Sequence, residues 1–184
     1  MLIGITGKKR SGKDTVANFL CEDYKFIRYS FADPMKKACK ILFNFTDEQL
    51  WGKDKELYDP RWGTTARKVL QLMGTEIFQY EFPKLMPEYG KLIGRTHWVK
   101  LFEMFYEDNK DRDIVFSDVR FFHEIEAIRK IGGEIWVVER DIANDSDDSH
   151  ASENEWVGIE PDELIVNNGT IKELEECVDS ILII

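Results

Sequence analysis

Cysteine and proline are scarce in this chain of 184 residues, which has three cysteines and five prolines, and basic residues are outnumbered by acidic ones. Cys21, Cys39 and Cys177 are odd in number and widely spaced, so the sequence predicts neither a disulfide framework nor a cysteine metal site. The 25 Lys and Arg residues face 35 Asp and Glu, for a formal net charge of -10. A duplex-binding surface needs basic side chains that neutralise phosphates, so no nucleic-acid polymer is expected as a partner.

Long hydrophobic runs are also lacking, since no apolar stretch of the sequence has the length that a bilayer span requires. A strand is predicted almost directly after Met1, which leaves no room for a leader segment. These features favour a cytoplasmic, reducing location without a membrane partner, and in a virus this would be the host cytoplasm. A chain of 184 residues is usually one domain and can bury a substantial core.

A glycine-rich turn with four basic residues near the N-terminus is the most informative stretch that is present. It follows a predicted strand at residues 2–6 and precedes a predicted helix around residues 16–20, which is the context of a phosphate-binding P-loop. Its glycines allow backbone N–H groups to approach phosphate oxygens, and the helix N-terminus adds partial positive charge. The predicted nucleotide-binding residues of this turn are Gly7, Lys8, Lys9, Arg10, Ser11, Gly12, Lys13, Asp14 and Thr15.

One position departs from the usual P-loop pattern G-x-x-x-x-G-K-[ST], because Asp14 stands where a hydroxyl normally contacts Mg²⁺. A carboxylate is an equally hard oxygen ligand, and Thr15 supplies a hydroxyl one residue later. We therefore expect ATP and Mg²⁺ as cofactors, with Lys13 reaching the β- and γ-phosphates. The plain alternative is a glycine turn that only carries surface cations.

Predicted strands and helices alternate along the chain, which indicates an α/β fold with a five-stranded parallel sheet covered by helices on both faces. The predicted strands are residues 2–6, 26–31, 113–117, 134–140 and 164–167. The predicted helices that follow the first are residues 34–43 with Asp33 as N-cap, 64–78, 98–106, 122–131 and 171–184. A polar connection that contains tryptophan occupies residues 46–63.

Residues 141–163 interrupt this alternation, because they are polar, acidic and without strong periodicity. A loop of that length between two core strands is more often functional than incidental. In a P-loop kinase this is the position of the lid.

Asp118 ends an apolar strand at the edge where ligands bind in open parallel sheets, so it is a candidate for metal binding through water. The alternative role is an N-cap for the following helix. Arg120 could bind phosphate through two hydrogen bonds, or could be an exposed arginine without a particular role.

Phosphoryl transfer requires convergent positive charge, for which the available residues are Lys9, Arg10, Lys13, Arg67, Arg120 and Arg140.

Arg67 and Gln71 are four residues apart on one predicted helix and therefore share a face, where they could bind the phosphate and base edge of an acceptor. Taken alone, the same pattern is typical of a solvated helix face. Arg95 could add a phosphate contact and Trp98 a stacking surface, although an isolated tryptophan is more often part of a core.

Together these segments resemble the deoxynucleoside monophosphate kinase family of phages and large DNA viruses, which is related to the animal-type phosphomevalonate kinases. The residues that carry the resemblance are 7–15, 65–67, 70–71, 74–75, 117–121, 150–153 and 167–169. The segments around Asp14, Asp118 and Ser152-Glu153 are common to both families. The helix with Arg67, Gln71 and Thr75, with Trp98 downstream, is similar to the nucleotide kinases and favours that family.

The resemblance implies a three-layer P-loop kinase fold in a single domain of residues 1–184, with a monophosphate-binding region at about 34–110 and a lid at about 141–163. By the same resemblance, Asn168 and Gly169 would approach the ATP base together with Arg140 at the edge of the lid. The implied acceptor-binding residues are Arg67, Gln71, Thr75, Arg95, Trp98, Arg120, Ser152 and Glu153. The lid is strongly acidic, so a role that such lids usually give to arginines could fall to Arg10.

The resulting hypothesis is an enzyme that transfers the γ-phosphoryl group of ATP to a deoxynucleoside 5′-monophosphate. Its candidate catalytic residues are Lys13, Arg10, Asp118 and Arg120, and its candidate metal ligands are Asp14 and Asp118. A kinase for another phosphorylated small molecule, such as phosphomevalonate, is one alternative, and a nucleotide-binding switch with a degraded active site is another. The oligomeric state stays open, with a homodimer as one option.

Overall fold

The computed structural model describes residues 1–141 and 158–182. The chain divides into two compact units, the first formed by Met1–Ser30 with Asp108–Ile184 and the second by Phe31–Glu107. The prediction that residues 1–184 form a single domain, with a monophosphate-binding region at about 34–110 and a lid at about 141–163, stays a prediction. The two units are described separately below.

The first unit is built on a five-stranded sheet in which every neighbouring pair is parallel, as the sequence predicts. The strand order is β2-β5-β1-β6-β7, so the strand that precedes the glycine-rich turn lies at the centre of the sheet. All residues of β1 are buried. The strands are β1 (Leu2–Thr6), β2 (Ile27–Tyr29), β5 (Ile114–Phe116), β6 (Glu134–Glu139) and β7 (Glu163–Val166).

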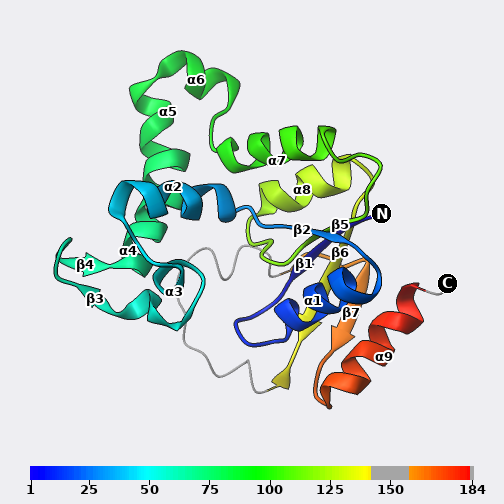
Figure 1. Ribbon diagram of the computed structural model, residues 1–184. Coiled ribbons are helices and arrows are strands. Elements are labelled where there is room, and N and C mark those ends of the chain that lie inside the picture. Colours follow the sequence, from blue (N-terminus) through cyan, green and yellow to red (C-terminus); the bar gives the residue numbers. More distant parts are fainter. Residues whose placement is uncertain (142–157, 183–184) are drawn as a thin grey trace. The chain divides into compact units, whose positions relative to one another are not determined.

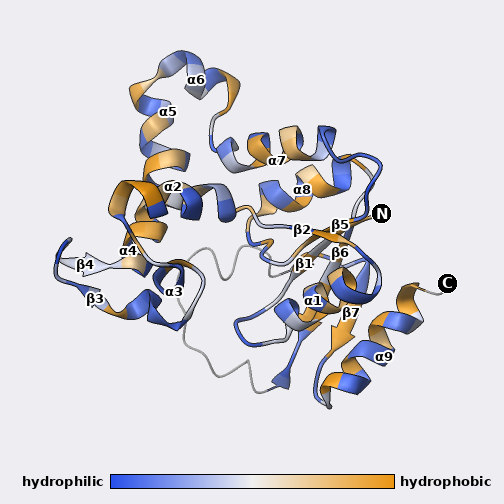
Figure 2. Cartoon of the chain, viewed as in Figure 1, coloured by the Kyte–Doolittle hydropathy of each residue, from blue (hydrophilic) through white to orange (hydrophobic). Residues whose placement is uncertain are grey.

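Helices cover both faces of this sheet, which confirms the predicted three-layer α/β architecture (Figure 1). Ile3 and Ile5 point to the face covered by α1 (Lys13–Asp23) and α9 (Ile171–Leu182) and belong to the same core cluster as Leu20 and Val178. Gly4 points to the opposite face, where an added Cβ would lie 2.7 Å from Ile128 of α8 (Phe122–Lys130). Apolar residues dominate the strands, whereas α9 alternates apolar and polar stripes (Figure 2).

The second unit begins with α2 (Asp33–Phe43), whose N-cap is Ala32. The prediction that Asp33 caps this helix is therefore wrong by one position. The Asp33 carboxylate instead accepts a hydrogen bond of 2.9 Å from the indole Nε1 of Trp51. A tertiary contact to a residue 18 positions away has taken up the side chain that could have capped the helix.

The polar connection predicted at residues 46–63 contains regular elements that its composition does not reveal. They are α3 (Asp47–Leu50), the 3₁₀ helix η1 (Lys53–Glu56) and β3 (Tyr58–Asp59), which pairs antiparallel with β4 (Thr64–Thr65). Asp59 organises this segment, because its buried carboxylate accepts hydrogen bonds from Gln49 at 3.0 Å and from the Arg61 guanidinium at 2.6 Å. These bonds hold the pKa of Asp59 well below its usual range.

The helix predicted at residues 64–78 starts later and continues further. Thr64 and Thr65 belong to β4, and the Thr65 hydroxyl caps α4 (Ala66–Gln71) by accepting a bond of 3.2 Å from the Lys68 N–H. The helical path continues as the π-helix η2 (Leu72–Glu81) and as α5 (Phe82–Leu85). Two further helices follow, α6 (Pro87–Leu92), which the sequence did not predict, and α7 (His97–Glu107), which it did.

A carbonyl within the π-helix has two side-chain donors. The Gly74 oxygen accepts hydrogen bonds of 2.8 Å from the Trp98 indole and 3.3 Å from the Gln79 amide. Both donors are buried. The two bonds pair the Gly74 carbonyl at a place where the chain departs from the α-helix that its apolar periodicity predicts. Among the described residues, no helix has the length and apolar character needed to cross a membrane.

Candidate active site

The glycine-rich turn has backbone angles that require glycine at two positions. Gly7 has φ +138° and Gly12, the N-cap of α1, has φ +110°. A Cβ at Gly7 would lie 2.2 Å from the Val138 carbonyl oxygen, and one at Gly12 would lie 2.3 Å from Asn167 Nδ2. The turn therefore packs directly against the ends of β6 and β7, and the strand, turn and helix predicted from the sequence are all present.

Lys13 begins α1 and folds its side chain back over the turn. Its Nζ donates hydrogen bonds to the carbonyl oxygens of Gly7 at 2.7 Å and Lys8 at 2.6 Å. The ammonium group is thus held beside the helix N-terminus, whose partial positive charge attracts anions. The two effects together make this end of α1 a strongly anion-attracting position.

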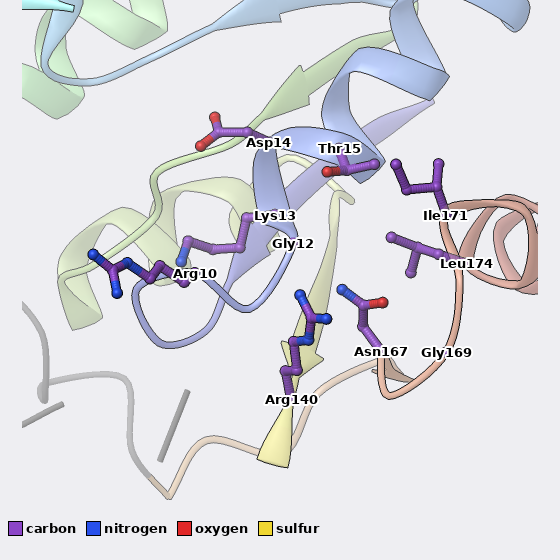
Figure 3. A pocket seen from close by; sticks show the side chains of 10 residues that line it. All are labelled: Arg10, Gly12, Lys13, Asp14, Thr15, Arg140, Asn167, Gly169, Ile171 and Leu174. Atoms are coloured by element: carbon purple, nitrogen blue, oxygen red, sulfur yellow. The ribbon is translucent and has the colours of Figure 1, made fainter. Parts of the chain in front are cut away.

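A cavity of about 350 Å³ opens beside the turn at the carboxyl end of the sheet (Figure 3). This size is in the range of small-molecule sites. Its walls combine cations from the turn and from the end of β6 with two apolar side chains of α9. The residues that line it are Arg10, Gly12, Lys13, Asp14, Thr15, Arg140, Asn167, Gly169, Ile171 and Leu174.

Asn167 links the turn to the end of β7, and the sequence analysis did not select it as a site residue. Its Nδ2 donates a 2.7 Å hydrogen bond to the Ser11 carbonyl, while its backbone N–H donates to Glu139 at 2.7 Å. Asn168 forms two hydrogen bonds with Asp141, and its place beside the ATP base stays a prediction. Gly169 lines the cavity.

The carboxylate of Asp14 is paired with a cation that the sequence analysis also missed. Arg28 of β2 contacts Asp14 through Nη2, and it donates 2.8 Å hydrogen bonds to Asn18 from Nη1 and to Ser117 from Nε. The only signal in the sequence was a charged residue within an otherwise apolar strand.

Asp118 and Arg120 lie on the turn that joins β5 to α8. The Ser30 hydroxyl donates a 2.6 Å hydrogen bond to Asp118 Oδ2. The N-cap of α8 is Phe121, so the alternative that Asp118 caps this helix is wrong. Within residues 1–141 and 158–182, no group of three or more His, Cys, Asp or Glu residues is arranged to hold a metal ion.

Glu124 of α8 binds the backbone of this turn and is another residue that the sequence analysis missed. Its Oε2 accepts hydrogen bonds from the backbone N–H groups of Arg120 at 2.8 Å and Phe121 at 3.1 Å. The side chain is almost fully buried, and burial raises the pKa of Glu124 to about 8 against the opposing effect of these two bonds. Glutamate at this helix position is typical of a capping box, but Phe121 at the N-cap is not a capping residue, so the sequence signal is incomplete.

Two of the predicted acceptor-binding residues of the second unit, Arg67 and Arg95, contact neighbouring side chains. Arg67 Nε donates a 2.8 Å hydrogen bond to Glu56. Gln71 lies four residues after Arg67 on the same short helix, α4. Thr75 lies in η2. The guanidinium carbon of Arg95 lies 4.5 Å from the centre of the Tyr80 ring.

Trp98 is a core residue of the second unit and not an exposed stacking surface. Only 6% of it is exposed, and its indole N–H is used by the Gly74 carbonyl. The predicted stacking role stays a prediction, and the burial of Trp98 fits the alternative that it is part of a core. Ser152 and Glu153, the two predicted lid residues, lie outside the described residues.

A parallel five-stranded sheet with a P-loop after its central strand defines the α/β class of P-loop kinases. Solved structures with a similar fold match nearly the whole chain. Shikimate kinase from Aquifex aeolicus VF5 has a TM-score of 0.54 at 14% identity, covering 100% of this chain and 94% of that one. TT1252 from Thermus thermophilus has a TM-score of 0.51 at 16% identity, covering 100% and 96%. At this level of identity the similarity concerns the fold alone.

Sequence comparisons are more specific. The family model for deoxynucleotide monophosphate kinase matches residues 1–62 and 55–178. A protein of Acanthamoeba polyphaga mimivirus, assigned as a deoxynucleotide monophosphate kinase, is 42% identical over 98% of this chain and 97% of its own length. The deoxynucleotide monophosphate kinase of Escherichia phage RB69 is 27% identical over 98% and 99%. The chain belongs to the deoxynucleotide monophosphate kinase family, which confirms the resemblance seen in the sequence.

Proposed function

We propose that the protein transfers the γ-phosphoryl group of ATP to a deoxynucleoside 5′-monophosphate and releases ADP and the deoxynucleoside diphosphate. The observation that carries the proposal is the P-loop cavity in a chain of this family. Its cationic turn and helix N-terminus are suited to a polyphosphate, and its volume of about 350 Å³ suits a small ligand.

The donor nucleotide is proposed to lie along this cavity, with its phosphates at the P-loop. Backbone N–H groups of the turn and the Lys13 ammonium would bind the phosphates, and Arg10 and Arg140 would add charge from the rim. The side chains of Ile171 and Leu174, beside Gly169, offer an apolar surface for the base. Asn167 would act on the donor indirectly, because it fixes the carbonyl of Ser11 within the turn.

The acceptor roles of Arg120 in the first unit and of Arg67, Gln71, Thr75 and Arg95 in the second stay predictions from the family resemblance. The hydrogen bond of Arg67 to Glu56 is exposed and can be exchanged for a phosphate without leaving a buried charge unpaired. The predicted lid residues Ser152 and Glu153 are proposed on resemblance alone.

The acceptor phosphate already carries negative charge and is a competent nucleophile, so no strong general base is required. The work of the protein is to align donor and acceptor, to screen their charges and to exclude water. Lys13 and Arg120 are proposed to stabilise charge on the transferred group, with Arg10 in support.

The available oxygen donors fit Mg²⁺, which is usually bound by one or two carboxylates together with substrate phosphates. Asp118, at the carboxyl end of β5, and Asp14 with the neighbouring Thr15 hydroxyl are the proposed ligands or water contacts. When bound, Mg²⁺ would neutralise part of the phosphate charge.

The test is an assay of ADP release with a panel of deoxynucleoside monophosphates, ribonucleoside monophosphates and phosphomevalonate. We expect turnover that depends on a deoxynucleoside monophosphate, with formation of its diphosphate checked by chromatography. Turnover with phosphomevalonate alone would assign the other kinase activity. Nucleotide binding without turnover for any acceptor would favour the switch alternative.

A further inference from the structure

Asp14 places a negative charge at a position that should attract phosphate. It lies in the first turn of α1 and lines the cavity beside Lys13. The helix dipole stabilises a carboxylate there, but the negative charge offsets the attraction of this helix end for phosphate and repels an incoming polyphosphate. If nothing offset it, this carboxylate would weaken the anion binding for which the rest of the turn is built.

Arg28 supplies the offsetting charge, and its position is determined by three contacts, two to α1 and one to the residue that follows β5. Its guanidinium contacts Asp14, while Asn18 of α1 and Ser117 after β5 accept hydrogen bonds of 2.8 Å each. Asn18 and Ser117 are uncharged, so they orient the guanidinium without neutralising it. Of the three groups that the guanidinium contacts, Asp14 is the one that carries a charge.

The direction of the Asp14 side chain supports the same conclusion. Its carboxylate points away from Arg140 and Asn167 on the other wall of the cavity (Figure 3). Arg28 itself does not line the cavity. The arginine is thus suited to hold and neutralise the carboxylate, and less suited to contact the nucleotide directly.

We propose that Arg28 is the counter-charge of the P-loop and assists polyphosphate binding by acting on Asp14. Arg28 is a positioning residue in this scheme, because it acts through another side chain. The inference rests on the proposed function, since it assumes that the cavity binds a nucleotide. It explains how a P-loop with aspartate after its lysine can remain anion-attracting.

A contribution to folding stability is a weaker explanation of the pair. The side chain of Asp14 is 78% exposed, and solvent-exposed ion pairs contribute little to stability. Dissolved salt screens charges that are more than a Debye length apart far more than charges in contact. The Asp14–Arg28 pair is therefore still expected to affect the binding of an anionic ligand at the same helix terminus.

The experiment is a double-mutant cycle read by ADP binding with EDTA present, so that neither metal nor turnover contributes. The variants are Arg28→Met, Asp14→Asn and the double variant, measured by titration calorimetry with thermal unfolding of each ligand-free protein. Arg112→Met is the matched control, because this exposed arginine precedes β5 at the amino end of the sheet, away from the cavity. Arg28→Lys retains the charge without the three-way contact.

We expect Arg28→Met to weaken ADP binding about tenfold when Asp14 is present and less than about twofold when Asn replaces it. Arg28→Lys should lose about threefold, and the control should bind as the parent does. Equal weakening by Arg28→Met in both backgrounds would overturn the inference, because it would mean that Arg28 contacts the nucleotide itself. Unchanged binding in Arg28→Met would overturn it as well.

These outcomes are distinguishable from failure of the proposed function. If the parent protein bound no nucleotide at all, the nucleotide site itself would be refuted together with the inference. If the parent bound ADP but the two substitutions showed no coupling, only the role of Arg28 would be refuted. If Arg28→Met did not fold, the same comparison would be made with Arg28→Lys alone and combined with Asp14→Asn.

Discussion

The two units of this protein are stabilised in different ways. The first unit has a continuous core in which Trp136, Ile165 and Val178 pack between the sheet and its helices. The second unit packs short helices on its own buried apolar residues, such as Leu70, Trp98 and Phe102, and adds the buried polar groups of Asp59 and Gln79. Apolar periodicity therefore predicts the elements of the first unit well, whereas polar contacts such as those of Asp59 leave no periodic trace in the sequence.

The residues proposed to bind nucleotide and acceptor also lie in different structural settings in the two units. In the first unit, the groups proposed to bind nucleotide lie on turns at one edge of a rigid sheet, and buried polar residues such as Asn167 and Glu124 hold those turns. In the second unit, the predicted acceptor residues lie on α4 and the irregular η2. Substitutions of the phosphate-binding residues of the first unit should therefore affect chemistry with little loss of fold, and substitutions of the buried polar residues Asp59 and Gln79 of the second should first affect its stability.

The largest effect is expected from Lys13→Ala. It should abolish phosphoryl transfer, with a loss of several kcal/mol of transition-state stabilisation, because this ammonium lies beside the proposed phosphates. The assay is ADP release with saturating substrates, and the thermal midpoint should stay close to that of the parent. Lys130→Met at the far end of α8 is the matched control. Near-normal turnover in Lys13→Ala would contradict the P-loop assignment.

Arg120→Ala and Arg67→Ala compare the two units directly. Each should weaken binding of the deoxynucleoside monophosphate by about 1.5–3 kcal/mol, since a charge-assisted contact to phosphate is lost. Binding of a non-hydrolysable ATP analogue should change much less. Separate titrations with acceptor and analogue measure both effects. Equal weakening of the two ligands would show that the arginine concerned is not specific to the acceptor.

Glu124→Gln should change how stability depends on pH. The pKa of Glu124 rises from 4.5 to about 8 because burial penalises its charged form, so in this window the folded state holds a proton that the unfolded state has lost. The stability of the parent should therefore fall as pH rises from about 4.5 to about 8, by up to about 1 kcal/mol per pH unit.

The measurement is urea unfolding of parent and variant at several pH values. The variant has no carboxyl group to titrate at this position, so the difference in stability between the two proteins should vary across the window. A constant difference would mean that Glu124 is ionised throughout.

The smallest effect is expected from Asp59→Asn in the second unit, which should lower the thermal midpoint by a few degrees at neutral pH. The pKa of Asp59 is depressed because Arg61 and Gln49 donate hydrogen bonds to its charged form. Its contribution is therefore present above its unfolded pKa of 3.8 and is lost as the pH falls through its folded value. Calorimetry of both proteins at neutral and acidic pH should show the midpoints converge in acid. A difference that persisted would point to lost packing.

Local patterns were sufficient for the five strands, the P-loop and the family. Each strand is a short apolar run bounded by turn residues, and Gly7 and Gly12 have a backbone role that no other residue can take. The sequence was misleading where tertiary bonds replaced local ones. Asp33 accepts a hydrogen bond from Trp51 in place of capping α2.

By itself, the sequence determined which segments become strands and helices and which turn binds phosphate, because spacing and turn chemistry act between near neighbours. Only the tertiary structure decided how the site is completed. The strand order β2-β5-β1-β6-β7 brings Arg28 to Asp14, Ser30 to Asp118 and Asn167 to Ser11. The last pair is separated by 156 positions along the chain. Such contacts depend on which strands lie side by side, and the sequence of one strand does not specify which strand will be its neighbour.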